Sequence, residues 1–258
     1  MAQRINYLWR LVVTGLCFAL FSVSSAMLTL LVLLPVTLFP GSTMQRHHRA
    51  QMLIQRSFAL LVGVLRLSGV MQLELRNAEL LRNCGNVLVF ANHPSYLDIV
   101  VILSQMPRST CIVNSRLWRS PFYGGIVRSA GYIRNDTPET LVHDCVSALD
   151  NGEPLIIFPE GTRSQPEGPL RMMRGAAHIV LNSRRDILPV ILSCNPRTLG
   201  KGTPWYRIPE RAFHFVLDVR PALAATHSVD LTDPPGVAAR KLTLFLEAYF
   251  TEELHRYA

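Results

Sequence analysis

Residues 86–98 read NVLVFANHPSYLD, and this stretch predicts a strand that turns directly into a helix. Asn86–Ala91 is a short β-branched run of the kind found in strands. His93 precedes a proline and is therefore expected in extended geometry, whereas Pro94 suits the opening of a helix predicted at Leu97–Gln105. The stretch predicts a strand-to-helix junction that carries His93.

His93 and Asp98 lie five residues apart across this junction. Side chains with that spacing diverge on one continuous helix, but they can converge across a turn. An aspartate hydrogen-bonded to one ring nitrogen fixes the histidine tautomer and leaves the other nitrogen free to accept a proton. We therefore expect a general base, His93, that activates a hydroxyl, oriented by Asp98. On spacing alone, a capped helix with a chance histidine explains the same residues.

Beyond the junction, strand-like runs alternate with helical ones. The predicted strands are 110–113, 131–134, 155–158, 187–192 and 213–219. The predicted helices are 138–149, 174–183 and a C-terminal helix with the apolar stripe Leu242, Phe245, Leu246, Tyr249 and Phe250. This alternation predicts an α/β domain. A Pro/Gly/Thr-rich segment at 195–209 is predicted to be a loop that could lie over the site.

A second polar stretch, FPEGTRS at residues 158–164, follows the predicted strand 155–158. The carboxyl end of a strand is where α/β folds tend to bind ligands. Arg163 could grip a phosphate with two hydrogen bonds. Glu160 could accept a hydrogen bond from an acceptor hydroxyl or hold that arginine, and Gly161 permits close backbone approach. The competing interpretation is a tight turn with a surface ion pair.

The N-terminal part contains 29 residues without a charge, from Leu11 to Phe39. This exceeds the roughly 20 residues that span a bilayer. A secretory signal peptide is the alternative, but the run is too long and Phe39-Pro40-Gly41 is a poor cleavage site. We expect a membrane anchor, either a tilted span or a bent helical pair. Arginines on both flanks leave its orientation open.

Residues 50–70 predict a second helix, in which apolar residues surround Arg56 and Arg66. Ten helical steps place these two arginines on roughly one face. An amphipathic helix at a membrane interface and a buried helix of the folded domain fit this pattern equally.

The charge is concentrated in the same part of the chain. The net charge is +8, and residues 1–76 hold seven arginines against the single acid Glu74. Basic charge beside apolar sequence suits an anionic membrane surface. Nucleic-acid binding is not expected, because its basic residues are more often interleaved with aromatic residues on a polar domain.

The five cysteines are scattered singly, without any CxxC pair. An odd number in this arrangement argues against a disulfide framework or a zinc site. We expect the catalytic part to face a reducing compartment.

Taken together, NHxxxxD at residues 92–98 and FPEGTRS at residues 158–164 resemble the glycerolipid acyltransferase family, which includes bacterial 1-acylglycerol-3-phosphate acyltransferases. The resemblance covers most of residues 85–195. Its further blocks are SRLWRSPFYG at 115–124, GYIRN at 131–135, RGAAHIVL at 174–181 and LPV at 188–190. The resemblance implies a single α/β domain at 76–258, with a central mixed sheet flanked by helices, preceded by an N-terminal hydrophobic helical membrane anchor at 1–75.

The resemblance also implies roles for single residues. The catalytic pair would be His93 and Asp98. The residues implied to bind the acceptor are Arg134, Glu160, Gly161, Thr162 and Arg163, with Arg134 and Arg163 on a phosphate. No metal or other cofactor is implied, and the acyl donor would be acyl-coenzyme A or acyl-acyl carrier protein. The implied location is the bacterial inner membrane, with the catalytic domain facing the cytoplasm.

Two departures from the family pattern concern the acceptor. Asn114 stands where many members carry a lysine, and Met172-Met173 stands where Phe-Lys is usual. Each removes a positive charge near the implied phosphate site. The implied activity is acyl transfer to a lipid hydroxyl, first of all that of 1-acyl-sn-glycerol 3-phosphate, giving phosphatidic acid. A lysophospholipid, a glycolipid or a specialised lipid metabolite stays open as acceptor.

Two other classes of function stay open as well. An esterase or thioesterase would transfer the acyl group to water, but the chain has no GxSxG nucleophile elbow. A non-catalytic lipid-binding protein of the same fold would not need an intact His93 and Asp98. The sequence leaves the oligomeric state undetermined.

Overall fold

A computed structural model describes residues 4–19, 39–165, 168–224 and 232–257. Its centre is a seven-stranded sheet of order β1-β7-β6-β2-β5-β3-β4. The strands are β1 (Met71–Arg76), β2 (Leu88–Ala91), β3 (Thr110–Asn114), β4 (Ile133–Asn135), β5 (Leu155–Ile157), β6 (Ile187–Asn195) and β7 (Phe213–Val219). Neighbouring strands run parallel except β6 and β7, which are antiparallel. The predicted mixed sheet is confirmed.

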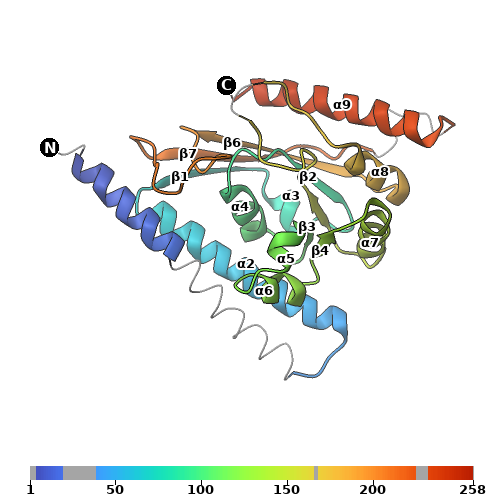
Figure 1. Ribbon diagram of the computed structural model, residues 1–258, viewed down its shortest axis with the longest axis horizontal. Coiled ribbons are helices and arrows are strands. Elements are labelled where there is room, and N and C mark those ends of the chain that lie inside the picture. Colours follow the sequence, from blue (N-terminus) through green and yellow to red (C-terminus); the bar gives the residue numbers. More distant parts are fainter. Residues whose placement is uncertain (1–3, 20–38, 166–167, 225–231, 258) are drawn as a thin grey trace.

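Helices cover both faces of this sheet, so the fold has three layers (Figure 1). The helices are α2 (Thr43–Leu67), α3 (Glu79–Arg82), α4 (Leu97–Gln105), α5 (Ser115–Trp118), α6 (Gly124–Ser129), α7 (Pro138–Asp150), α8 (Arg174–Ser183) and α9 (Pro235–His255), together with a helix at residues 4–19. One core joins the sheet to α2, α4 and α6, and a second joins it to α7, α8 and α9.

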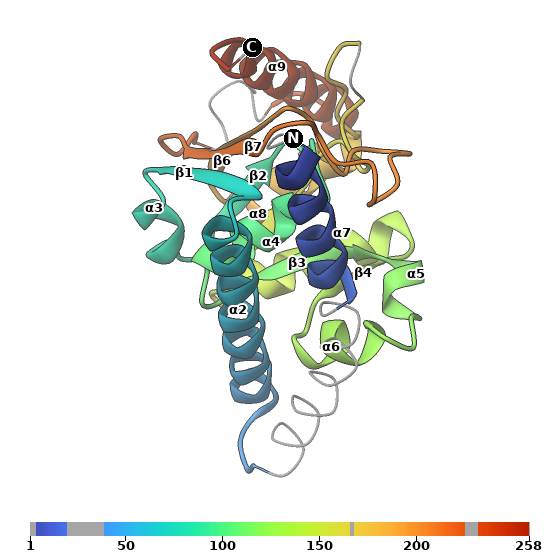
Figure 2. The same cartoon turned by 90° about the vertical axis from the view of Figure 1, so that its left-hand side faces the viewer.

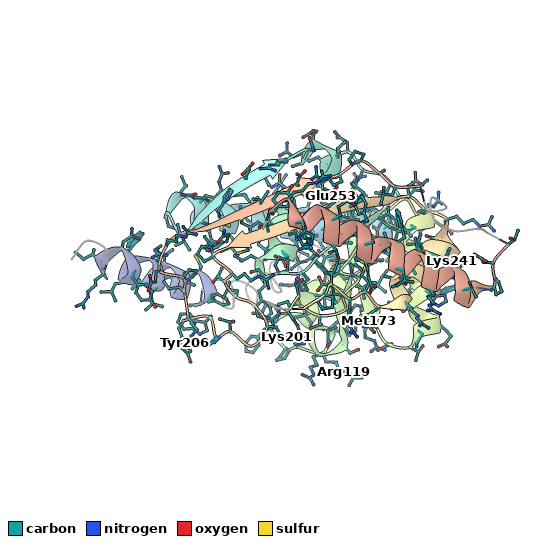
Figure 3. The ribbon with its side chains drawn as sticks, turned by 90° about the horizontal axis from the view of Figure 1, so that it is seen from above. Arg119, Met173, Lys201, Tyr206, Lys241 and Glu253 are labelled. Carbon is teal, nitrogen blue, oxygen red and sulfur yellow. The ribbon has the colours of Figure 1, made fainter. Side chains whose placement is uncertain are left out.

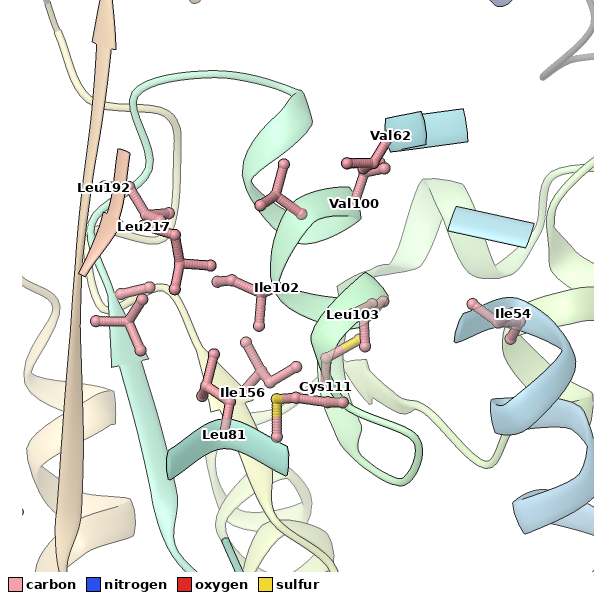
Figure 4. Close-up of a cluster of buried hydrophobic side chains, with 14 of the residues drawn as sticks. Ile54, Val62, Leu81, Val100, Ile102, Leu103, Cys111, Ile156, Leu192 and Leu217 are labelled. Carbon is pink, nitrogen blue, oxygen red and sulfur yellow. The ribbon is translucent and has the colours of Figure 1, made fainter. Parts of the chain in front are cut away.

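The central strand β2 shows why its sequence is apolar throughout. Val89 and Ala91 contribute to the core on the α4 side, while Leu88 and Phe90 contribute to the core on the α8 side. Side chains of a strand alternate between the two faces of a sheet, and a strand covered on both faces needs apolar residues at every position. Figure 4 shows the first of these cores, in which Ile102 of α4 lies near Ile156 of β5.

The helix predicted at residues 50–70 is α2, and both interpretations of its pattern describe part of it. Ala50, Ile54, Val62 and Leu65 are buried, and α2 packs against α4 and α6. The opposite side exposes apolar residues, with Leu67 92% exposed. Among the described residues, α2 is the one helix long and apolar enough to cross a membrane. In its most apolar 18-residue stretch, 28% of the residues are buried.

The helix at residues 4–19 lies beside α2 (Figures 1 and 2), and the indole Nε1 of Trp9 donates to the carbonyl of Ser68 at 2.9 Å. It carries the first part of the uncharged run predicted at 11–39. Residues 20–38 of that run lie outside the described residues, so a membrane span there stays a prediction.

Two strands differ from the sequence-based expectation. Strand β1 was not expected, and it pairs in parallel with β7 from Met71↔Phe213 to Arg76↔Asp218. Strand β6 continues past Leu192 to Asn195, because β7 pairs with it over that length. The loop between β6 and β7, residues 196–212, contains most of the predicted 195–209 segment.

Candidate active site

The two polar stretches meet at one edge of the sheet. Strands β2 and β5 are parallel neighbours, with Leu88 opposite Leu155 and Phe90 opposite Ile157. His93 follows β2 and Phe158 follows β5, so both stretches leave the same edge. The two aromatic rings stack at a centroid distance of 4.2 Å. The NHxxxxD and FPEGTRS motifs therefore contact each other at the edge of the sheet where the sequence predicted a site.

His93 and Asp98 converge through the turn before α4. The imidazole Nδ1 lies 2.7 Å from Asp98 Oδ2, which also accepts a hydrogen bond from the backbone N–H of Ser95 at 2.7 Å. The turn bends the chain so that Asp98, in the first helical turn, points back at the ring. Since an ionised carboxylate only accepts hydrogen bonds, the neutral ring must carry its proton on Nδ1. Nε2, which no described residue bonds, is then the basic nitrogen.

Burial makes the carboxyl of Asp98 an unusual acid. The residue is fully buried, and burial raises the pKa of its carboxyl to about 6, although the hydrogen bond and charge of His93 oppose this shift. Among the described residues, no group donates to its second oxygen, Oδ1. A buried carboxylate that accepts few hydrogen bonds is stabilised strongly by a positive charge beside it. Asp98 therefore favours the imidazolium that forms when His93 takes a proton.

The FPEGTRS turn holds the backbone of His93 on both sides. Glu160 Oε1 accepts from the N–H of His93 at 2.9 Å and from the hydroxyl of Ser164 at 2.7 Å. The N–H of Ser164 donates to the carbonyl of His93 at 2.7 Å. The desolvation of Glu160 raises its pKa. One oxygen of Glu160 thus positions His93, a contact that the sequence did not predict, and Ser164 joins it.

Asn92 joins the same junction to β6, the other strand that neighbours β2. Its buried side-chain amide donates to the carbonyl of Leu192 at 2.8 Å and accepts from the N–H of Leu192 at 2.7 Å. This pair of bonds continues the pairing of β2 with β6 beyond the last paired backbone residue, Ala91. Asn92 belongs to the NHxxxxD motif, but only the structure reveals what its side chain bonds.

Arg163 is bound by neutral groups. Its Nη1 donates to the carbonyls of Leu199 at 3.2 Å and Gly200 at 2.6 Å, and its Nη2 donates to the hydroxyl of Tyr96 at 2.9 Å. The guanidinium carbon lies 3.5 Å from the centroid of the Tyr96 ring. The FPEGTRS turn is thereby joined to the 196–212 loop and to the motif that carries His93.

Gly161 and Thr162 form the exposed tip of the turn. Gly161 has a φ of +67°, in the left-handed region, and an added Cβ would lie 3.1 Å from Cγ of Met173. Both conditions favour glycine. Met173 directly precedes α8 and is exposed at the molecular edge that also carries Lys201 (Figure 3).

Arg134 lies farther along the same edge. It belongs to β4, which is three strands from β2, so about 14 Å separates the two strands. Its guanidinium forms an ion pair with Asp136. Asn114, which stands where a lysine is usual in the family, is the last residue of β3. Its side chain accepts from the N–H of Arg116 at 2.8 Å and caps α5.

Two thiols, that of Cys194 near the site and that of Cys84 ahead of β2, are poor nucleophiles. Burial raises the pKa of Cys194, close enough to feel the charge of Asp98, to about 12, and that of Cys84 to about 11. Both thiols stay protonated near neutral pH, and it is the thiolate that attacks. Within the described ranges, no group of three or more His, Cys, Asp or Glu residues is arranged to hold a metal ion.

Comparisons with known proteins match this chain to acyltransferases. Residues 72–193 match the family described as Acyltransferase. A 1-acyl-sn-glycerol-3-phosphate acyltransferase of Helicobacter pylori is 35% identical over 115 residues, covering 42% of this chain and 48% of that protein. The enzyme of that name from Escherichia coli is 30% identical over 131 residues, covering 48% and 53%. The chain thus matches about half the length of these relatives.

A solved structure extends the likeness in fold to nearly the whole chain. The 1-acyl-sn-glycerophosphate acyltransferase of Thermotoga maritima superimposes with a TM-score of 0.74, covering 99% of this chain and 98% of that one at 18% identity. The matched residues 72–193 contain His93, Asp98 and the whole FPEGTRS turn. Residues 72–193 therefore match the acyltransferase family, and this matched region includes the candidate active site.

Proposed function

We propose that this protein is an O-acyltransferase that moves a fatty acyl group from a thioester to a lipid hydroxyl. The observation that carries the proposal is the 2.7 Å contact of His93 Nδ1 with buried Asp98, which leaves Nε2 as the base at the sheet edge. Nε2 accepts the hydroxyl proton while the hydroxyl oxygen attacks the thioester carbonyl. The new C–O bond forms, the C–S bond breaks, and the leaving thiolate takes the proton from His93. These steps call for no cofactor beyond the donor, acyl-coenzyme A or acyl-acyl carrier protein.

We propose 1-acyl-sn-glycerol 3-phosphate as the acceptor and phosphatidic acid as the product. The names of the matched relatives support this choice. Arg163 keeps its Nε–H and one Nη2 hydrogen, enough for a pair of bonds to phosphate oxygens. Gly161 and Thr162 at the tip of the turn would let the acceptor approach, and Glu160 has one oxygen to offer a hydroxyl. Arg134 would contact the phosphate with its charge partly offset by its ion pair with Asp136.

We propose further that the protein works at a membrane surface. Two helices present apolar side chains to the outside. On the helix at residues 4–19 these are Ile5, Leu8, Trp9, Val12 and Leu16, and on α2 they are Leu60, Val64 and Leu67. The excess of arginine in residues 1–76 suits anionic lipids. The proposed location is the bacterial inner membrane, with the catalytic domain in the cytoplasm.

An acceptor screen tests the proposal. Purified full-length protein is given labelled acyl-coenzyme A or acyl-acyl carrier protein with 1-acyl-sn-glycerol 3-phosphate, a lysophospholipid, a glycolipid or no acceptor. We expect labelled phosphatidic acid with the first acceptor and little label released as free fatty acid. Release of fatty acid at the same rate with and without acceptors would identify a thioesterase and contradict acyl transfer.

A further inference from the structure

Tyr96 lies between the two residues of the proposed catalytic pair, and its side chain points to Arg163. Its hydroxyl accepts from Nη2 of Arg163 at 2.9 Å, and the guanidinium lies over its ring. Its backbone N–H donates to the carbonyl of Leu199 at 3.3 Å. No role for Tyr96 follows from the sequence, since it occupies one of the variable positions of NHxxxxD.

The surroundings of Arg163 fix its direction without neutralising its charge. Its guanidinium donates to the hydroxyl of Tyr96 and to the carbonyls of Leu199 and Gly200, all of which are neutral. Among the described residues, no carboxylate lies within ion-pair distance of it. Arg134, in contrast, is already paired with Asp136. An arginine held rigidly by neutral groups keeps its full attraction for an anion and loses little entropy on binding one.

The 196–212 loop is fastened near its C-terminal end and at its middle, which limits the movement of the carbonyls of Leu199 and Gly200. Arg10, on the helix at residues 4–19, donates to the carbonyls of Pro209 and Glu210. Near the middle of the loop, the ring of Trp205 lies 6.0 Å from that of Phe18. Figure 3 shows the loop residue Tyr206 on the side of the molecule where this helix lies.

We propose that Tyr96 is a positioning residue for recognition of the acceptor: it holds the guanidinium of Arg163 so that the free N–H groups face an anionic headgroup beside His93. This inference rests on the proposed acyl transfer to a phosphorylated acceptor. It makes Tyr96 a determinant of selectivity for the phosphate. Tyr96 takes no part in proton transfer, because its hydroxyl bonds Arg163 and not the catalytic pair.

The test compares Tyr96→Phe with wild type in steady-state kinetics. The substitution keeps the ring and removes one hydrogen bond to a charged group. We expect the KM for 1-acyl-sn-glycerol 3-phosphate to rise about fivefold. The donor KM and kcat should stay within about twofold, because the catalytic pair is untouched. Tyr206→Phe, at an exposed tyrosine of the same loop, is the matched control and should resemble wild type.

A double-mutant cycle separates positioning from a general effect on folding. In an Arg163→Ala background, Tyr96→Phe should raise the acceptor KM no further, since no guanidinium is left to hold. An unchanged acceptor KM in the single variant, an equal rise in the donor KM, or additive effects in the double variant would each overturn the inference. Failure of the wild type to acylate any acceptor would instead overturn the proposed function.

Discussion

At the scale of single residues, the chemistry depends on the contrast between the buried Asp98 and the accessible face of His93. The sequence could predict that these two side chains converge, because a proline after the histidine places a turn between them. It could not predict that burial raises the pKa of Asp98 to about 6, since that depends on the side chains packed around the carboxyl.

The raised pKa of Asp98 predicts how activity depends on pH. Its carboxyl is ionised above about pH 6 and protonated below it. A protonated Asp98 stabilises the imidazolium that forms at His93 less, so kcat falls as the pH falls. We expect kcat to decline steeply between about pH 7 and 5. A flat profile over this range, with circular dichroism showing an intact fold, would be incompatible with the proposed base.

Ser164 offers a second test at this scale. Ser164→Ala removes the hydroxyl that donates to Glu160 but keeps the backbone bond to the carbonyl of His93. A loosened Glu160 should misplace the imidazole slightly, and we expect kcat to fall about 3- to 30-fold while both KM values change little. Kinetics of the variant would measure this, with Ser193→Ala on β6 as a control. A rise in acceptor KM at unchanged kcat would assign Ser164 to substrate binding instead.

At the scale of elements, sequence patterns predicted most strands and helices of the central sheet but not how its edges are completed. Met71–Arg76 was not predicted as a strand; it is a short segment with three polar side chains, and only its pairing with β7 makes it a strand. The bond between Asn92 and Leu192 joins residues 100 positions apart, so no local pattern reports it. The same holds for the contacts of Arg163 with the 196–212 loop.

The attachment of this loop to the N-terminal helix can be tested by proteolysis. Arg10 is buried, and Arg10→Ala would leave the carbonyls of Pro209 and Glu210 without their donor. Hydrogen bonds from a charged group contribute about 1.5–3 kcal/mol, so the loop should detach more often without them. We expect trypsin to cleave within residues 196–212 several times faster, whereas Arg4→Ala, at an exposed site on the same helix, should not change the rate. Equal cleavage of the two variants would show that Arg10 does not hold the loop.

At the scale of the whole molecule, the two cores and the outer apolar faces serve different purposes. The helices α7, α8 and α9 close one side of the sheet, and α4 with one face of α2 closes the other. The remaining apolar face of α2 is exposed together with that of the helix at residues 4–19. The hydrophobic pattern of residues 50–70 could not separate these two roles, because one helix fills both.

The exposed face of α2 predicts which substitutions release the protein from membranes. Leu60 and Leu67 are 71% and 92% exposed, so replacing both by glutamate should cost the fold little stability. We expect the double variant to bind anionic phospholipid vesicles at least tenfold more weakly in a co-sedimentation assay, because apolar contact is lost and like charge is added. Leu244→Glu, at an exposed leucine of α9, is the matched control. Wild-type binding by the double variant would exclude this face from the membrane contact.

The central claim is that His93 is the base of an acyl transfer. It is tested most directly by the rate at which purified His93→Ala converts labelled acyl donor and 1-acyl-sn-glycerol 3-phosphate to phosphatidic acid. We predict a fall in kcat of about 10²- to 10⁴-fold, with thermal stability and vesicle binding close to wild type. Turnover at the wild-type rate in this variant would contradict the account.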